Sequence, residues 1–145
     1  MKNIGRIAGI IVLMAAFLQG CGTKERTTTS GLTYTMIEEG AGKMPVDGEY
    51  VVLEMAYGVG DSIWYETSEV GPVVMVKNDS AWNTGEMIHE IFGQMRVGDS
   101  VEFTVDAESL FTKTWRQQVP PEIAPGTIFN FNVSLDSVLT QEEYG

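Results

Sequence analysis

Alternation of hydrophobic and polar residues predicts β-strands along most of the chain. In the segments 50–57, 100–105 and 128–135 every second residue is apolar, which places those side chains on one face of a sheet. Shorter apolar segments that follow turn residues are also predicted strands, at 34–37, 63–66 and 73–76. The pattern therefore indicates an antiparallel sheet with one apolar face.

One segment has helical periodicity instead. Between residues 85 and 95 the apolar side chains recur at helical spacing, and they are Met87, Ile88, Ile91, Phe92 and Met95. Gly98 provides a stop signal for this helix. The segment 106–126 contains three prolines and is predicted to be a long loop with room for one helical turn. Together these elements describe an α+β domain, in which the short amphipathic helix covers the apolar face of the sheet.

The first residues have the features of an export signal. Lys2 and Arg6 give a basic start, and the apolar run 7–18 is too short to span a bilayer comfortably. The run ends in Leu-Gln-Gly-Cys at 18–21, which resembles a bacterial lipobox. This resemblance implies that Cys21 is acylated and anchors the protein in the cell envelope, with Gly22 favouring the outer membrane. The alternative is an ordinary secretory signal with an incidental cysteine.

These features divide the chain into four parts. We expect a lipoprotein signal peptide at 1–20, an acylated cysteine and flexible polar tether at 21–30, one domain at 31–138 and an acidic tail at 139–145. Removal of Lys2 and Arg6 takes the formal net charge from −11 to −13. So acidic a domain does not favour nucleic acid as a partner.

The sequence offers no pattern typical of a cofactor or metal site. Cys21 is the only cysteine, so no intramolecular disulfide can form. His89 is the only histidine and lies off the apolar face of the predicted helix, where we expect it to be exposed to solvent. We therefore expect no cofactor and no metal, and a monomer.

Several short motifs resemble FKBP-type peptidyl-prolyl cis–trans isomerases, in the order in which that family has them. The motifs are Glu-Gly-Ala-Gly at 39–42, Tyr-Glu-Thr-Ser at 65–68, Pro-Val-Val-Met-Val at 72–76, Met-Arg-Val-Gly-Asp at 95–99, Val-Pro-Pro at 119–121 and the strand 128–135. The resemblance covers residues 31–138. It implies an FKBP-like antiparallel sheet wrapped on one short amphipathic helix.

The resemblance also implies a site, an aromatic cup that holds a prolyl ring. The positions that correspond to catalytic residues are Tyr65, Glu66, Ile88, Phe111 and Phe131, and those that correspond to substrate-binding residues are Met55, Val73 and Val119. Ile88 stands where the family has a tryptophan floor, and Phe111 where it has a tyrosine whose hydroxyl binds a substrate carbonyl. Trp82 lies in the segment just before the helix, and the sequence leaves open whether its ring enters the cup. From periodicity alone Tyr65, Phe111 and Phe131 are by default core residues, and Glu66 is equally a solvated rim charge.

Isomerisation of this kind needs no nucleophile. Rotation about an X–Pro bond has a barrier of about 18–20 kcal/mol from amide resonance. An apolar cup binds the twisted, less polar amide better than the planar one, which lowers this barrier. We expect weak isomerase activity on proline-containing polypeptide clients, which would assist the folding of exported proteins. The alternatives are a non-catalytic peptide-binding or chaperone-like module and a structural subunit of a surface assembly.

Overall fold

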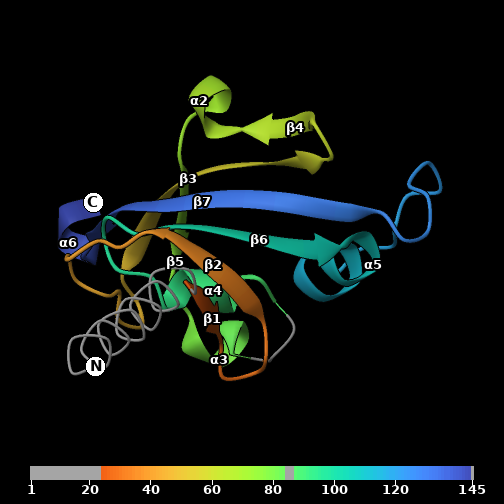
Figure 1. Ribbon diagram of the computed structural model, residues 1–145. Helices are drawn as coiled ribbons and strands as arrows, with labels where there is room; N and C mark the ends of the chain where they lie inside the picture. The colour runs from red at the N-terminus through yellow and green to blue at the C-terminus, as the bar shows by residue number, and fades with distance from the viewer. Residues whose placement is uncertain (1–23, 84–86, 145) are drawn as a thin grey trace, which may run out of the picture.

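The computed structural model describes residues 24–83 and 87–144, so the predicted signal peptide and Cys21 lie outside the described residues. Within them the chain forms an antiparallel seven-stranded sheet in the order β1-β2-β6-β7-β3-β4, with β5 also paired to β3 (Figure 1). The strands are β1 (Glu25–Thr27), β2 (Thr33–Glu38), β3 (Tyr50–Val59), β4 (Ser62–Glu66), β5 (Val73–Val76), β6 (Ser100–Asp106) and β7 (Ile128–Leu139). Every strand predicted from the alternation is confirmed.

The helices are all short. They are α2 (Thr67–Val70), α3 (Asp79–Trp82), α4 (His89–Gly93), α5 (Ala107–Ser109), the π-helix η1 (Leu110–Thr114) and α6 (Gln141–Tyr144). None of the described helices is long and apolar enough to span a membrane. The α4 helix lies against the sheet, as predicted, whereas α5 and η1 lie at the far end of β6 (Figure 1). The fold class, an α+β domain with a sheet covered by one short amphipathic helix, is confirmed.

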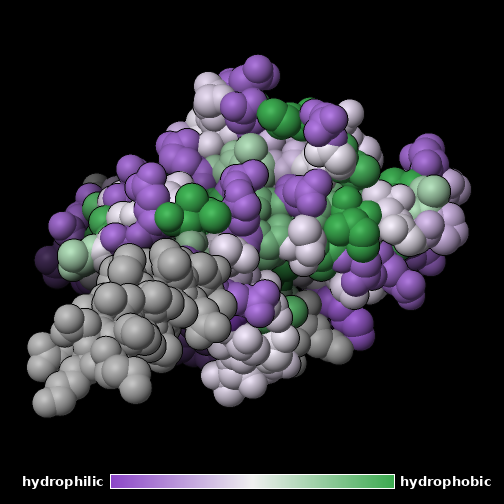
Figure 2. Space-filling view, viewed as in Figure 1, coloured by the Kyte–Doolittle hydropathy of each residue, from purple (hydrophilic) through white to green (hydrophobic). Residues whose placement is uncertain are grey.

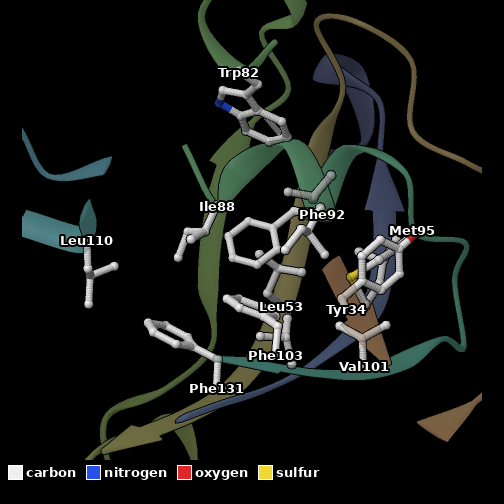
Figure 3. Packing of buried hydrophobic residues seen from close by; sticks show 14 of the residues in the cluster. Tyr34, Leu53, Trp82, Ile88, Phe92, Met95, Val101, Phe103, Leu110 and Phe131 are labelled. Atoms are coloured by element: carbon white, nitrogen blue, oxygen red, sulfur yellow. The ribbon is translucent and has the colours of Figure 1, made fainter. Parts of the chain in front are cut away.

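The core lies between α4 and the sheet. In Figure 3, Phe92 of α4 points toward Leu53, Phe103 and Phe131 of the strands. Along β7 the residues at every second position are buried, namely Phe129, Phe131, Val133 and Leu135. Each such fully buried side chain contributes about 1.5–3 kcal/mol relative to an exposed one. The alternation in the sequence is thus the alternation of buried and exposed sides of the sheet.

The turn at 95–99 joins α4 to β6 and holds a neighbouring loop. Gly98 has a φ of +97°, a conformation that favours glycine. The buried Asp99 carboxylate accepts hydrogen bonds from the Gly40 N–H at 2.6 Å and the Arg96 N–H at 2.8 Å. A Cβ on Gly40 would lie 2.3 Å from the Val97 carbonyl oxygen, so only glycine fits there. Two of the sequence motifs, 39–42 and 95–99, therefore form one structural unit.

The chain is ordered on both sides of the predicted domain. Residues 25–27 form β1, which pairs with β2, although 21–30 was predicted to be a flexible tether. Threonine favours strands, and the backbone of β1 pairs without any apolar side chain, so the hydrophobic pattern gave no signal. At the other end β7 extends to Leu139, and Tyr144 of the predicted tail stacks on Tyr50 with ring centroids 4.1 Å apart.

The prediction of an exposed His89 is wrong. Its ring lies between Trp82, at 5.4 Å, and Phe92, at 5.5 Å between centroids. Its Nδ1 atom is buried and has no hydrogen-bond partner among the described residues. Burial lowers the pKa of the imidazole, because the charged form is poorly solvated there. The prediction failed because α3, which the sequence pattern did not indicate, covers the outer side of α4.

Candidate functional site

A row of stacked aromatic rings crosses four strands of the sheet. Phe103 of β6, Phe131 of β7, Tyr57 of β3 and Tyr65 of β4 are successive Cα partners. The ring centroids are 4.9 Å apart for Phe103–Phe131, 4.9 Å for Tyr57–Phe131 and 5.1 Å for Tyr57–Tyr65, with all three pairs stacked. We call these four residues the aromatic row. Within this row the Tyr57 ring stacks on Phe131 on one side and on Tyr65 on the other.

A β-bulge adds an indole beside the row. The register of β3 and β4 shifts after the Tyr57–Tyr65 pair, so Trp64 has no direct Cα partner. Its ring meets Phe129 edge-on, with centroids 5.0 Å apart and planes at 88°. Trp64 is 54 % exposed and its neighbour Ile63 is 64 % exposed. The bulge therefore presents apolar surface at the open edge of the row.

The segment after β6 closes the other side. Phe111 of η1 is buried and meets Phe129 with centroids 6.2 Å apart. Trp115 follows η1 and contacts both Phe111, edge-on at 4.8 Å, and Tyr57, at 5.9 Å. Rings from the sheet and from this segment thus surround Tyr57, and together they form the candidate site.

One apolar groove is lined by two of these rings, and a second groove shares residues with the first. One groove of about 420 Å³ is lined by Val59, Trp64, Phe111, Pro120, Glu122, Ile123, Ala124 and Thr127. A second groove of about 670 Å³ lies between α5 and the loop 118–126, and Val119 and Pro121 line it. Figure 2 shows hydrophobic residues gathered near this end of the sheet, where the exposed apolar residues are Ile63, Trp64 and Ile128. An apolar surface of this kind is typical of a binding site.

The polar groups within the aromatic row itself are the hydroxyls of Tyr57 and Tyr65, whereas Glu122 lines the adjacent groove. Burial, with a smaller effect of the neighbouring Tyr65, raises the pKa of the Tyr57 hydroxyl, so it stays protonated at neutral pH. The Tyr57 and Tyr65 hydroxyls make no hydrogen bond with another residue of the described ranges. Within residues 24–83 and 87–144, no group of three histidine, cysteine or acidic side chains is placed to hold a metal ion.

The structure brings three of the predicted catalytic residues into one cluster. Tyr65 and Phe131 both stack on Tyr57, and Phe111 reaches the same cluster through Trp115 and Phe129. Ile88 immediately precedes α4, is 6 % exposed, and donates its backbone N–H to Thr114 Oγ1 at 3.1 Å. Figure 3 shows its side chain on the same side of α4 as Phe131 and Leu110.

The other predicted residues lie elsewhere. Met55 is opposite Val133, Val73 is opposite Leu53, and Val119 lines the second groove. Glu66 is opposite Ala56, so the pleat directs it away from the face on which Tyr65 stacks. Trp82 packs against His89, and Figure 3 shows it on the other side of α4 from Phe131.

Sequence reasoning missed Tyr57, Trp64, Phe129 and Trp115. The assignment of Met55 came from counting back from Tyr65 with a longer turn than the observed one, Gly60 and Asp61. Across this turn the strand partner of Tyr65 is Tyr57, which lies two residues after Met55 on the same face of β3. The signal for Tyr57 was present, because it shares the apolar alternation of 50–57. Trp115 gave no such signal, since it lies outside any periodic segment.

Comparison with known proteins identifies the fold. The chain matches no protein-family model and no curated protein sequence. Among solved structures, FkpA from Escherichia coli has a TM-score of 0.59 and 18% identity over 81% of this chain and 53% of its own. The chain thus spans about half the length of FkpA.

Two further structures match over most of their own length. A peptidyl-prolyl cis–trans isomerase from Pseudomonas syringae pv. tomato has a TM-score of 0.56 and 15% identity over 81% of this chain and 82% of its own. The N-terminal domain of FKBP42 from Arabidopsis thaliana has a TM-score of 0.57 and 15% identity over 80% of this chain and 92% of its own. With the sheet and the motifs in place, the chain has the FKBP-like fold, in a sequence that has diverged far from these proteins.

Proposed function

We propose that this protein binds proline-containing polypeptide segments at the ring cluster around Tyr57 and accelerates their cis–trans isomerisation weakly. The observation that carries the proposal is the aromatic row, in which Tyr57 also contacts Trp115. Trp115 in turn contacts Phe111, and Phe111 lines an apolar groove. The FKBP-like fold supports it, since matched structures include a peptidyl-prolyl cis–trans isomerase.

The geometry suits a proline ring and the amide that precedes it. Aromatic rings offer flat apolar faces against which a prolyl ring packs, and they exclude water from the amide. The twisted amide has lost its resonance and tolerates this environment better than the planar amide does. Tyr57 adds a protonated hydroxyl with no partner among the described residues, which can hold a carbonyl of the bound segment.

Three features favour slow turnover. Phe111 has no hydroxyl to donate, and loss of one such donor costs about 1–3 kcal/mol. Glu66 faces away from the row, so it places no charge next to the amide. Ile88 is aliphatic and packed in the core, so it offers a smaller contact than a ring.

The second candidate function is peptide binding without catalysis. The exposed residues Ile63, Trp64 and Ile128 favour it, because they extend the apolar surface beyond what a single proline needs. Such a surface suits an unfolded chain that exposes several apolar side chains, as a chaperone-like module would bind.

We also propose that Cys21 carries lipid and holds the domain at the cell envelope, where its clients would be exported proteins. Several acyl chains on one residue anchor stably, since each buried methylene contributes about 0.8 kcal/mol. Incorporation of a clickable fatty acid by the intact protein, but not by Cys21→Ser, would support the anchor. Equal labelling of both would contradict it.

The test of the catalytic proposal is a proline isomerisation assay on the full protein in detergent, beside Tyr57→Ala and Phe111→Tyr. We expect the unmodified protein to accelerate the reaction slightly, Tyr57→Ala to abolish this, and Phe111→Tyr to increase it. Binding of the peptide without acceleration, together with a gain in Phe111→Tyr, would favour the non-catalytic function. Neither binding nor acceleration in any variant would contradict both.

A further inference from the structure

Trp115 differs from the ring-bearing residues named below in lying outside any strand or helix. The rings of the aromatic row come from strands, and Phe111 comes from η1, whereas Trp115 lies just beyond η1. It is half-buried, and its two ring contacts, with Phe111 and Tyr57, place it at the outer side of the cluster. A ring in this position can contact both the other rings of the cluster and a polypeptide segment bound against them.

The backbone around Trp115 fixes its position. Its N–H donates to the Leu110 carbonyl at 3.0 Å, and the Gln117 N–H donates to the Phe111 carbonyl at 2.7 Å. Between them Arg116 has a φ of 56°, which non-glycine residues rarely adopt. Such left-handed residues cluster at ligand-binding and active sites, where the surrounding structure holds them. The turn therefore holds the indole against Tyr57.

The indole nitrogen of Trp115 has no acceptor in the described part of the chain. Trp115 makes no side-chain hydrogen bond with another described residue, and its Nε1 is not buried, since His89 Nδ1 is the one buried side-chain nitrogen or oxygen without a partner in the described ranges. An indole N–H donates but cannot accept. The group suited to it on a bound polypeptide is a backbone carbonyl oxygen.

We propose that Trp115 contacts the bound segment directly, packing its ring on the segment and donating its N–H to a backbone carbonyl next to the proline. This role rests on the proposed binding of proline-containing segments. The indole N–H gives the site the directional hydrogen-bond donor that Phe111 does not supply. The two rings are in contact, with centroids 4.8 Å apart. Trp115 thereby becomes a determinant of which carbonyl, and so which register of the peptide, the site accepts.

The first test separates the donor from the ring. Trp115→Phe keeps an aromatic ring and removes the N–H, and we expect it to bind a fluorescent proline-containing peptide about fivefold more weakly, as the loss of one hydrogen bond predicts. Adding Phe111→Tyr to Trp115→Phe should restore most of the loss, because it adds a hydroxyl donor to a ring whose centroid lies 4.8 Å from that of Trp115. Trp82→Phe is the matched control, since Trp82 packs on the far side of α4, and its affinity should stay unchanged.

The second test needs no change at Trp115. The chain has three tryptophans, whose indole N–H resonances can be assigned with Trp64→Phe and Trp82→Phe. On titration of the unmodified protein with the peptide, the Trp115 resonance should move downfield as it forms a hydrogen bond, whereas that of Trp82 should stay in place.

The outcomes distinguish the two proposals. If the unmodified protein binds but Trp115→Phe binds equally well and the Trp115 resonance stays in place, the role of Trp115 is overturned and the binding function stands. If the unmodified protein does not bind the peptide, the proposed function fails, and the role of Trp115 fails with it.

Discussion

Tyr57 and Phe131 are direct Cα partners across β3 and β7, and their rings stack with centroids 4.9 Å apart and planes 25° from parallel. A stacked aromatic pair contributes about 0.5–1.5 kcal/mol beyond the burial of its area. Phe131 is 2 % exposed, whereas Tyr57 is only half-buried, and its hydroxyl has no hydrogen-bond partner within 24–83 and 87–144. The pair therefore joins the hydrophobic core to the surface that we propose as the binding site.

Tyr57→Ala should weaken both stability and peptide binding. Removing a large ring from such a site lowers the free energy of unfolding by about 3 kcal/mol, because the stacked neighbours lose their contacts. We expect the affinity for a proline-containing peptide to fall by more than tenfold in a fluorescence anisotropy titration. Tyr57→Phe keeps the ring and should retain most of the stability.

Met55→Ala is the control for Tyr57→Ala. Met55 lies two residues earlier on the same face of β3, opposite Val133, outside the ring cluster. It should lower stability but leave the affinity within about twofold. A loss of affinity as large as that of Tyr57→Ala would restore Met55 to the site and contradict our assignment of Tyr57.

Much of the fold was predictable because the sheet has one buried face. From Phe129 to Leu135 apolar and polar residues alternate, and the structure buries Phe129, Phe131, Val133 and Leu135. β1 could not be predicted in this way, because it pairs through its backbone and all three of its side chains are exposed. α3 was missed for a related reason, since a helix of four residues is too short to show a period.

The site was predictable only in part, because its geometry depends on local departures from regular structure. Tyr65, Phe111 and Phe131 lie in the ring cluster, and their roles in a site stay a prediction. The position of Tyr57 depends on the length of one turn, and that of Trp115 depends on a π-helix and a left-handed Arg116. Neither a turn length nor a π-helix has a reliable signature in residue periodicity.

Glu66→Gln should leave catalysis unchanged. The Glu66 side chain faces away from the aromatic row, and its carboxylate forms no hydrogen bond or ion pair with another described residue. We expect kcat/KM for proline isomerisation to stay within twofold of that of the unmodified protein. A tenfold loss with unchanged thermal stability would show that the carboxylate reaches the site and would support its predicted catalytic role.

Ser30→Ala should loosen the N-terminal part of the domain. The Ser30 hydroxyl donates to Oε1 of Glu90, whose side chain on α4 is only 3 % exposed. Loss of the donor leaves a buried carboxylate without a partner, which costs about 1–3 kcal/mol in the free energy of unfolding. Denaturant unfolding would measure this cost, and hydrogen exchange should become faster in β1 and β2. Thr29→Ala is the control, because Thr29 is exposed and should have almost no effect.

His89 should make stability depend on pH near neutrality. Burial lowers the pKa of the folded imidazole, while the unfolded chain titrates at about 6.5. Below that pH the unfolded state binds a proton that the folded state does not, so the free energy of unfolding falls as pH falls. Its slope approaches about 1.4 kcal/mol per pH unit until the folded pKa is reached. Above about pH 7.5 this contribution should be constant.

His89 is the only histidine in the chain, so no other imidazole contributes to the pH dependence of the free energy of unfolding. Urea unfolding between pH 5.5 and 7.5 avoids the range in which Glu49 and Asp106 titrate, since hydrogen bonds lower the pKa of both carboxyls. His89→Leu removes the titrating group and should give a free energy of unfolding that is flat across this range. An equal slope in the unmodified protein and in His89→Leu would show that another group is responsible and that His89 is solvated after all.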